Sequence, residues 1–390
     1  MTHSERYYRM TVMSYIMILL AAFSLDGCKS KSEDISHFSQ TIYSPRYAGG
    51  FEITGSDGRN STLITVSKPW QGADSVYSSL LICRDGESVP DGYSGQVLHG
   101  DARRVIVMSS TDIAMLDAIG AVDKVVGASG VRYIANQYIC DKKDSIGEVG
   151  YEGNIDYEQI IALDPDIVML YGVNGASSME GKLKELCIPY IYIGDYLEES
   201  PVGKAEWMVV LAEIVGCRDK GIEVFGSIPQ RYEILKKLVA DASCSRPAVM
   251  LNMPYADSWF MPPVNSYMVR LIEDAGGDYL FSDNDSGVSV PIDIETAYMF
   301  TSRADVWLNV GTAQSIADVK RMVNKVADVP CVDKGELYNN NLRQTSAGGN
   351  DFFESGVVYP DLILRDLINI FHPGLLSGEE TEMIYYKKLE

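Results

Sequence analysis

The sequence predicts an α/β protein of two lobes with mostly parallel sheets, joined by one long helix and preceded by a β extension. The helix is predicted over residues 219–242, where apolar residues recur every three or four positions. At 1.5 Å of rise per residue it is about 36 Å long, enough to span a small domain. Pro229 lies inside it and is expected to kink it, because proline lacks a backbone donor.

Two stretches that flank this helix follow one α/β plan. Residues 158–170 pass from a helix, through a turn at Asp166, into a run of apolar residues. Residues 295–310 repeat that order, with Asp305 in the turn. Strands that alternate with helices indicate parallel sheets covered on both faces, so we expect one such sheet in each lobe and a cleft between the lobes.

The chain divides into segments of distinct pattern. Between Thr41 and Gly100, short β-branched and aromatic runs are separated by turn clusters, which is typical of β-hairpins. The predicted segments are a signal peptide at 1–27, a polar tether at 28–40, a β-hairpin extension at 41–100, an N-terminal lobe at 101–198, linking helices at 199–243, a C-terminal lobe at 244–373 and a tail at 374–390.

The bulk composition excludes several partners. A length of 390 residues suits two domains, and 46% hydrophobic residues are ample for buried cores. The formal net charge of −21 argues against nucleic acid and against an anionic membrane surface as direct partners.

The N-terminus has the features of an export signal. The apolar run 12–23 has the length of a signal peptide and is too short to span a bilayer. It ends in Leu25 to Cys28, which resembles the lipoprotein cleavage box in which the cysteine is acylated; Asp26 departs from the usual small residue. We therefore expect a cell-envelope lipoprotein anchored through Cys28, facing the periplasm or the cell surface. An ordinary secretory signal or membrane anchor is the alternative.

Metal and catalytic motifs are missing from the sequence. The remaining cysteines form no CxxC pair and are expected to be free buried thiols, with Cys187 in an apolar context. There are 4 histidines, and two of them, His3 and His37, precede the folded part, so a site for a bare metal ion is not expected. No Walker loop, HExxH or nucleophile elbow is present. A carboxylate pair such as Asp283 and Asp285 keeps a surface enzyme acting on a chelate or glycan as the alternative.

Several stretches, in this order along the chain, carry a likeness to a known family. They are residues 104–110, 115–127, 153–168, 266–277 and 351–355. The chain from about Arg103 to Pro373 thereby resembles the substrate-binding proteins of ABC importers for cobalamin, ferric siderophores and haem. That resemblance implies two Rossmann-like lobes bridged by a backbone helix. The β extension has no counterpart in the plainest family members.

The resemblance gives roles to one glutamate in each lobe. Glu158 and Glu295 match the positions that dock into arginines of the permease. A bidentate contact at both ends would set the orientation of the receptor on its partner. Without the resemblance, each is simply a solvated glutamate in a first helical turn, where the helix dipole favours it.

The cleft is expected to be lined by aromatic residues that follow strands or lie in polar loops. A macrocycle or catecholate gains from flat apolar walls with polar tips. These candidates are Tyr133, Tyr151, Tyr255, Trp259, Phe352 and Phe353. Arg132 and Arg343 are candidates to pair with negative charge on a ligand. The alternative is that the aromatic residues pin loops and that the arginines are structural.

The resemblance therefore predicts a lipid-anchored receptor, without catalysis or a resident cofactor, that captures a ferric siderophore and delivers it to an ABC permease. Cobalamin or another corrinoid is the second candidate ligand. Haem, held by a tyrosine axial ligand, is the third. We expect a monomer that meets the membrane only through its anchor.

Overall fold

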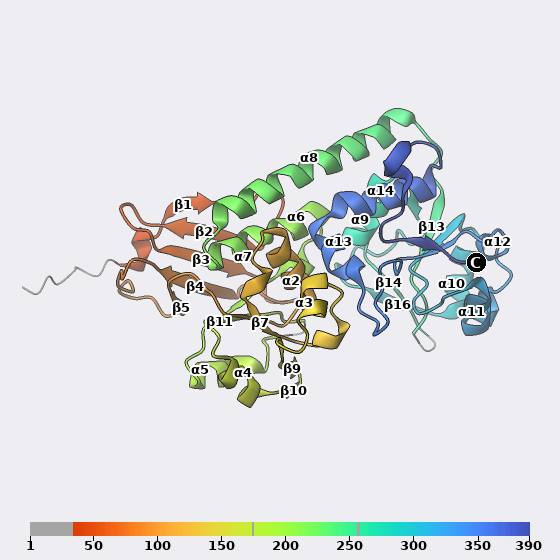
Figure 1. Cartoon of the computed structure of the whole chain (residues 1–390). Helices are drawn as coiled ribbons and strands as arrows, with labels where there is room; N and C mark the ends of the chain where they lie inside the picture. The colour runs from red at the N-terminus through yellow and green to blue at the C-terminus, as the bar shows by residue number, and fades with distance from the viewer. Residues whose placement is uncertain (1–33, 174, 256–257) are drawn as a thin grey trace, which may run out of the picture.

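The structure is a computed structural model that describes residues 34–173, 175–255 and 258–390. The predicted signal peptide, Cys28 and the first part of the tether lie outside the described residues. An N-terminal sheet, an N-terminal lobe and a C-terminal lobe follow one another along an elongated molecule, with the long helix running beside all three (Figure 1).

The N-terminal sheet is built from the segment expected to form hairpins. Its strands, in spatial order, are β1 (Gln40–Tyr43), β2 (Phe51–Gly55), β3 (Thr62–Ser67), β4 (Tyr77–Cys83) and β5 (Gln96–His99). Neighbouring strands are antiparallel except β4 and β5, which are parallel. Alternate residues of β2 and β3 are buried, as expected for a sheet with one face on the core.

The polar tether predicted at 28–40 includes several residues that are folded in the structure. Ile35–His37 forms the short helix η1, and the Ile35 amide donates to the Asp91 carbonyl at 3.1 Å. Phe38 is buried in a small cluster with Leu81 and Cys83. The apolar side chains of this segment therefore hold it against the outer face of the sheet.

The N-terminal lobe has a fully parallel sheet. Its spatial order is β12 (Tyr190–Tyr192), β11 (Ile167–Leu170), β6 (Val105–Val107), β7 (Val125–Ala128) and β8 (Gly147–Glu148). Its helices are α2 (Ser110–Ala118), α3 (Gln137–Asp141), α4 (Tyr157–Leu163) and α5 (Met179–Glu185), and β9 (Gly150–Tyr151) pairs with β10 (Asn154–Ile155) in a small hairpin. Every residue of β6, β11 and β12 is buried, which is the pattern of a parallel sheet covered on both faces.

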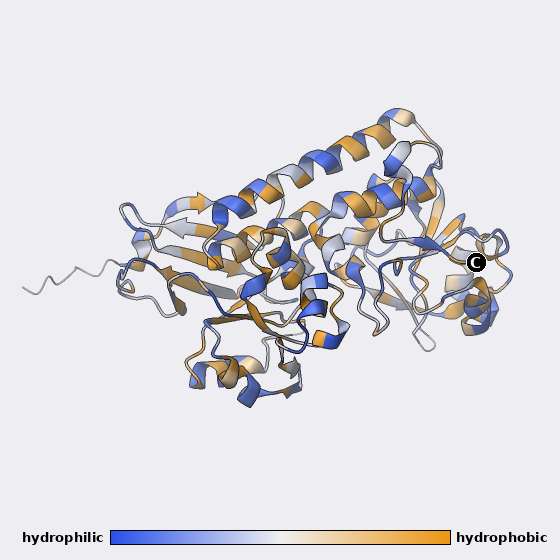
Figure 2. Ribbon diagram, viewed as in Figure 1, coloured by the Kyte–Doolittle hydropathy of each residue, from blue (hydrophilic) through white to orange (hydrophobic). Residues whose placement is uncertain are grey.

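The linking segment contains α6 (Pro201–Glu206), α7 (Met208–Ile214) and the long helix α8 (Arg218–Ala242). Helices α6 and α7 are buried throughout. Helix α8 packs on α7 and on the C-terminal lobe, and it is assigned as one helix across the buried Pro229. Figure 2 shows that α8 carries hydrophilic and hydrophobic residues along its whole length, as an amphipathic surface helix does.

The C-terminal lobe repeats the α/β plan. Its main sheet has the order β15 (Asp278–Tyr279), β13 (Ala248–Leu251), β17 (Val306–Leu308), β18 (Leu337–Asn339) and β19 (Lys387–Lys388), in which only β19 is antiparallel to its neighbour. A separate ribbon joins β14 (Trp259–Met261) to β16 (Val290–Ile292). The helices are α9 (Tyr267–Asp274), α10 (Ile294–Thr301), α11 (Ile316–Met322), α12 (Pro330–Asp333), α13 (Ser355–Val358) and α14 (Pro360–Phe371).

The segment expected to be a tail, 374–390, is part of this lobe. It supplies β19, and both Tyr385 and Tyr386 are fully buried. The Asp366 carboxylate accepts hydrogen bonds from the backbone amides of Ile384, Tyr385 and Tyr386. Since these buried tyrosines complete the core, the lobe extends to the end of the described chain.

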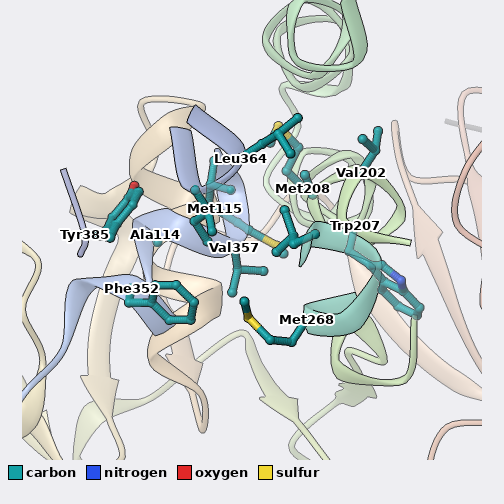
Figure 3. Close-up of a cluster of buried hydrophobic side chains, with 14 of the residues drawn as sticks. Ala114, Met115, Val202, Trp207, Met208, Met268, Phe352, Val357, Leu364 and Tyr385 are labelled. Carbon is teal, nitrogen blue, oxygen red and sulfur yellow. The ribbon is translucent and has the colours of Figure 1, made fainter. Parts of the chain in front are cut away.

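One hydrophobic core runs through both lobes. In the cluster of Figure 3, Met115 of α2 and Met208 of α7 lie with Met268, Val357 and Leu364 from the C-terminal lobe. A shared core of this kind resists a wide hinge motion, because opening the lobes would expose apolar surface.

The prediction of buried thiols is wrong for two cysteines. Cys187 and Cys244 are exposed, Cys140 and Cys217 are partly buried, and Cys83 and Cys331 are buried. Cys187 lies in the turn between α5 and β12, and its backbone is left-handed, with φ of 56°. Its side chain is therefore exposed although its sequence neighbours are apolar.

Candidate functional site

A cavity of about 610 Å³ lies between the two lobes. The N-terminal lobe contributes Ser110 and Tyr133, and the C-terminal lobe contributes most of the wall. The cavity lies at the carboxyl ends of β13, β17 and β18, the sheet edge at which open α/β sheets bind ligands. Its size is within the ~300–1,000 Å³ typical of small-molecule pockets.

Three of the predicted aromatic residues line this cavity. Tyr133 comes from the N-terminal lobe, and Phe352 and Phe353 come from the short helix η6 (Asp351–Phe353) of the C-terminal lobe. The Phe352 and Phe353 rings stand nearly perpendicular, at 84°, with centroids 5.1 Å apart. Tyr133 and Phe353 are about half exposed, whereas Phe352 is buried against Tyr385 and Tyr386.

Trp259 was expected to line the cleft, and the structure shows that this prediction is wrong. Its side chain has 0% exposure and packs against Trp307, with ring centroids 5.3 Å apart. Its indole Nε1 donates to the Leu251 carbonyl at 2.9 Å. Trp259 begins strand β14 and belongs to the core of the lobe, so it does not reach the cavity.

The other predicted ligand residues are not among the described residues that line the cavity. Tyr151 is exposed on β9, and Tyr255 is 80% exposed. The Arg132 guanidinium lies 4.2 Å from the centroid of the Tyr133 ring, next to the cavity wall. Arg343 forms an ion pair with Asp351 at 2.9 Å, which gives it a structural partner.

Sequence reasoning missed the most frequent polar side chain of the wall, the carboxamide. The carboxamide residues that line the cavity are Asn252, Asn309, Asn339, Asn340, Asn341, Gln344 and Asn350. A signal was present, since Asn252 and Asn309 each directly follow an apolar strand of the repeated plan, and Asn339 ends the next strand. Strand order brings these three strand ends together at one edge.

Glu354 connects the lobes beside the cavity. Its carboxylate accepts hydrogen bonds from the backbone amides of Ala135 and Asn136, at 2.8 and 2.9 Å. Burial raises the pKa of Glu354 to about 7 and outweighs the effect of these amide donors. Near neutral pH this carboxyl group is therefore poised between its charged and neutral forms.

The two predicted docking glutamates occupy equivalent positions. Glu158 on α4 and Glu295 on α10 are both exposed and each lies two residues after an aspartate that caps its helix. Asp156 accepts from the Gln159 amide, and Asp293 does the same for Thr296.

The surroundings of the two docking glutamates differ. Lys325 forms an ion pair with Glu295 at 2.6 Å, and this hydrogen bond is the main reason why the pKa of Glu295 is lowered. No ion pair of Glu158 is found within the described part of the chain.

Two features are absent from the described residues. In the described ranges, no His, Cys, Asp and Glu side chains cluster in a way that would hold a metal ion. Nor is any helix of those ranges both long and apolar enough to cross a membrane.

Two α/β lobes, a connecting helix and an interlobe cavity define a bilobal solute-binding protein. Residues 105–338 match the family described as periplasmic binding protein, and the chain belongs to that family. The family resemblance stated from the sequence motifs is thereby confirmed, and so is the predicted fold class.

Solved structures of the same fold come from several bacteria. A periplasmic binding protein of Veillonella parvula is 14% identical, with a TM-score of 0.56 over 77% of this chain and 95% of that one. A periplasmic haem-binding protein of Pseudomonas aeruginosa is 16% identical, with a TM-score of 0.55 over 70% and 94%. At these identities the likeness concerns the fold.

Related sequences include lipoproteins of an archaeon. An uncharacterized lipoprotein of Methanocaldococcus jannaschii is 26% identical over 77% of this chain and 72% of its own length. A second uncharacterized lipoprotein of that organism is 23% identical over 97% of this chain and 99% of its own length.

Proposed function

We propose that this protein is the substrate-binding lipoprotein of an ABC importer, which captures a metal chelate between its lobes and delivers it to the permease. The observation that carries the proposal is the interlobe cavity, which has aromatic walls from both lobes and a polar sheet edge. Aromatic faces with a few polar groups suit a flat or multi-ring chelate. Family membership supports binding over catalysis.

Delivery is proposed to depend on Glu158 and Glu295. Each is exposed near the start of a helix in its own lobe, so a permease with two arginine clusters would contact both lobes at once. Since the lobes share a hydrophobic core, we expect limited closure on the ligand.

Attachment to the cell envelope is proposed to occur through a lipid on Cys28. The relatives named as lipoproteins support this proposal. A Cys28→Ser variant should move from the membrane fraction to the soluble fraction, whereas Cys187→Ser, at an exposed cysteine of the N-terminal lobe, should not. Retention of Cys28→Ser in the membrane would contradict the lipid anchor.

The candidate ligands expected from the sequence are a ferric siderophore first, a corrinoid second and haem third. One experiment compares the binding of all three. The soluble form that begins at Lys29 is titrated calorimetrically with ferric siderophores, cyanocobalamin and haemin. We expect one-to-one binding of one class and recovery of unaltered ligand. Silence across all classes would refute the proposed solute, and ligand turnover would favour the surface enzyme.

Docking is tested separately from binding. The double variant Glu158→Arg with Glu295→Arg should abolish transport in a reconstituted importer and leave ligand affinity unchanged. Loss of ligand affinity in this variant would place the two glutamates in the binding site instead.

A further inference from the structure

The polar side chains that line the cavity are mostly of one kind. Carboxamides are its main polar side chains, and among the described residues none that lines it is lysine, arginine or histidine. Glu354 is the carboxylate of the wall, and the formal net charge of the chain is −21. The Arg132 guanidinium lies next to the wall, where it stacks on the Tyr133 ring. An anionic group held by the wall itself would therefore lose its hydration without a cation among the residues that line the cavity, which is unfavourable.

Two asparagines offer complementary hydrogen-bonding groups at neighbouring strand ends. Asn252 follows β13 and Asn309 follows β17, and both have left-handed backbones, with φ of 66° and 58°. Asn252 Nδ2 donates to the Phe260 carbonyl at 3.2 Å, which leaves its Oδ1 as an acceptor. Asn309 Oδ1 accepts from the Tyr386 hydroxyl at 3.0 Å, which leaves its Nδ2 as a donor.

This pairing matches an amide on the ligand. A primary carboxamide carries a carbonyl acceptor and an N–H donor on the same edge, so it can bond to Asn309 and Asn252 together. A trans peptide group points its carbonyl and its N–H in opposite directions, and it can bond to either asparagine. Strands β13 and β17 are hydrogen-bonded neighbours, and the backbone amide of Asn252 donates to the backbone carbonyl of Leu308 at 3.0 Å. The sheet therefore holds the backbones of the two asparagines side by side.

Further polar atoms of the wall lack a partner. Asn340 and Asn341 are 7% and 6% exposed, and Asn341 Oδ1 forms no hydrogen bond within the described part of the chain. Ser266 Oγ, at the start of α9, also lacks one there. Both unpaired atoms are buried behind the surface of the wall, so a ligand would meet Asn252 and Asn309 before it could reach them.

We infer that the ligand is an uncharged chelate that carries carboxamide or peptide amide groups around its metal. This inference rests on the proposed function and narrows it. A neutral ferric trihydroxamate built on a cyclic peptide and an amide-bearing corrinoid share this chemistry. Ferric tricatecholates and haem, which carry negative charge, do not.

The inference is tested with two ligand pairs that differ in charge. The first pair is dicyanocobinamide and dicyanocobyrinic acid, which share ring and cobalt but carry amides and carboxylates respectively. The second is a ferric trihydroxamate cyclic peptide and a ferric tricatecholate. Each is titrated calorimetrically into the soluble form that begins at Lys29.

We expect the uncharged member of one pair to bind at least ten-fold more tightly than its anionic partner, and the pair in which it binds identifies the source of the amides. Equal or tighter binding of an anionic member overturns the inference and leaves the proposed receptor function standing. If none of these ligands binds and haemin does not bind either, the preference for an uncharged ligand and the proposed receptor function are both overturned.

A variant with added charge tests the electrostatic part in the same protein. Gln344 lines the cavity and is exposed, so Gln344→Lys adds a cation to the wall at an accessible position. The ratio of the affinity for the uncharged member to the affinity for its anionic partner should fall by at least three-fold in Gln344→Lys. Gln230→Lys, on the exposed face of α8, changes the net charge equally and should leave the preference unchanged. Equal effects of the two variants would overturn the role of the wall.

A second variant tests the carboxamides. Asn340→Ala should weaken binding of the uncharged member about ten-fold, whereas Asn324→Ala, an exposed asparagine outside the cavity, should not. Thermal unfolding of both variants establishes that they are folded at the titration temperature. Unchanged affinity in folded Asn340→Ala would remove that residue from the recognition of the ligand and overturn this part of the inference.

Discussion

The carboxylate of Glu354 accepts a hydrogen bond from the backbone amide of Ala135 at 2.8 Å and so joins the C-terminal lobe to the N-terminal lobe. This contact lies beside the cavity, and Thr111 adds a second link by donating to the Phe353 carbonyl at 3.0 Å. Gly349 packs here so closely that an added Cβ would clash with the Tyr133 carbonyl oxygen. The two lobes therefore meet in a close contact at this edge of the cavity.

The Glu354 contact predicts a measurable pH dependence of folding. Burial raises the pKa of this carboxyl group from 4.5 to about 7 in the folded chain. Between these values the folded state holds the proton and the unfolded state has lost it, so the contribution of Glu354 to stability falls as pH rises through this window.

The comparison is between wild type and Glu354→Gln, unfolded with denaturant at pH 5 and pH 8. The free energy of unfolding of the wild type, minus that of the variant, should decrease by on the order of 2 kcal/mol between these pH values. The subtraction removes the titration of all other groups. A difference that stays constant with pH would contradict the raised pKa.

Trp259 is predicted to be a stability residue. Because it is fully buried and its Nε1 bonds to the Leu251 carbonyl, Trp259→Ala should lower the free energy of unfolding by about 3–5 kcal/mol. Tyr255→Ala, at a side chain that is 80% exposed, should change it by no more than about 0.5 kcal/mol. Denaturant unfolding measures both, and similar small effects would place Trp259 outside the core.

The aromatic wall is predicted to contribute to ligand affinity. Tyr133→Ala and Phe353→Ala should each weaken chelate binding by about three- to ten-fold, since each removes a ring that lines the cavity. Tyr151→Ala is the matched control, because Tyr151 is an exposed tyrosine of the same lobe as Tyr133 and is not among the described residues of the wall. Calorimetric titration measures the chelate affinity of the three variants. Weaker binding in Tyr151→Ala alone would mean that the ligand sits elsewhere.

The ion pair between Lys325 and Glu295 is predicted to compete with the permease. Lys325→Ala frees the Glu295 carboxylate, so the receptor concentration that half-saturates the permease should fall by about two- to five-fold. Lys320→Ala breaks a different exposed ion pair of the same lobe, with Asp333, and should have no such effect. Stimulation of permease ATPase activity is the measurement. Equal responses of the two variants would argue for a general effect of charge.

Local pattern was sufficient to predict the repeated architecture, and the structure shows why at particular residues. Asp166 and Asp305 occupy equivalent turns of the two lobes. The Asp166 carboxylate accepts from the amides of Arg103 and Arg104 just before β6, and Asp305 accepts from the Ala248 amide at the start of β13. Caps, turns and apolar periodicity act over a few residues, so they can be read along the chain.

Segment ends and the cavity wall were predicted less well. Whether Phe38 hangs in a tether or packs on a sheet, and whether Tyr386 belongs to a tail or a core, depends on a partner surface distant in sequence. The same holds for Trp259, whose aromatic character suits a cavity and a core equally.

The sequence by itself determined two α/β lobes, the long helix between them, a glutamate near the start of one helix in each lobe and the family. These features follow from short-range periodicity and motifs. Only the tertiary structure decided that Tyr133 and Phe353, from different lobes, line one cavity and that Asn252 and Asn309 stand side by side. The physical reason is strand order, since hydrogen bonding between β13 and β17 brings together strand ends that lie far apart along the chain.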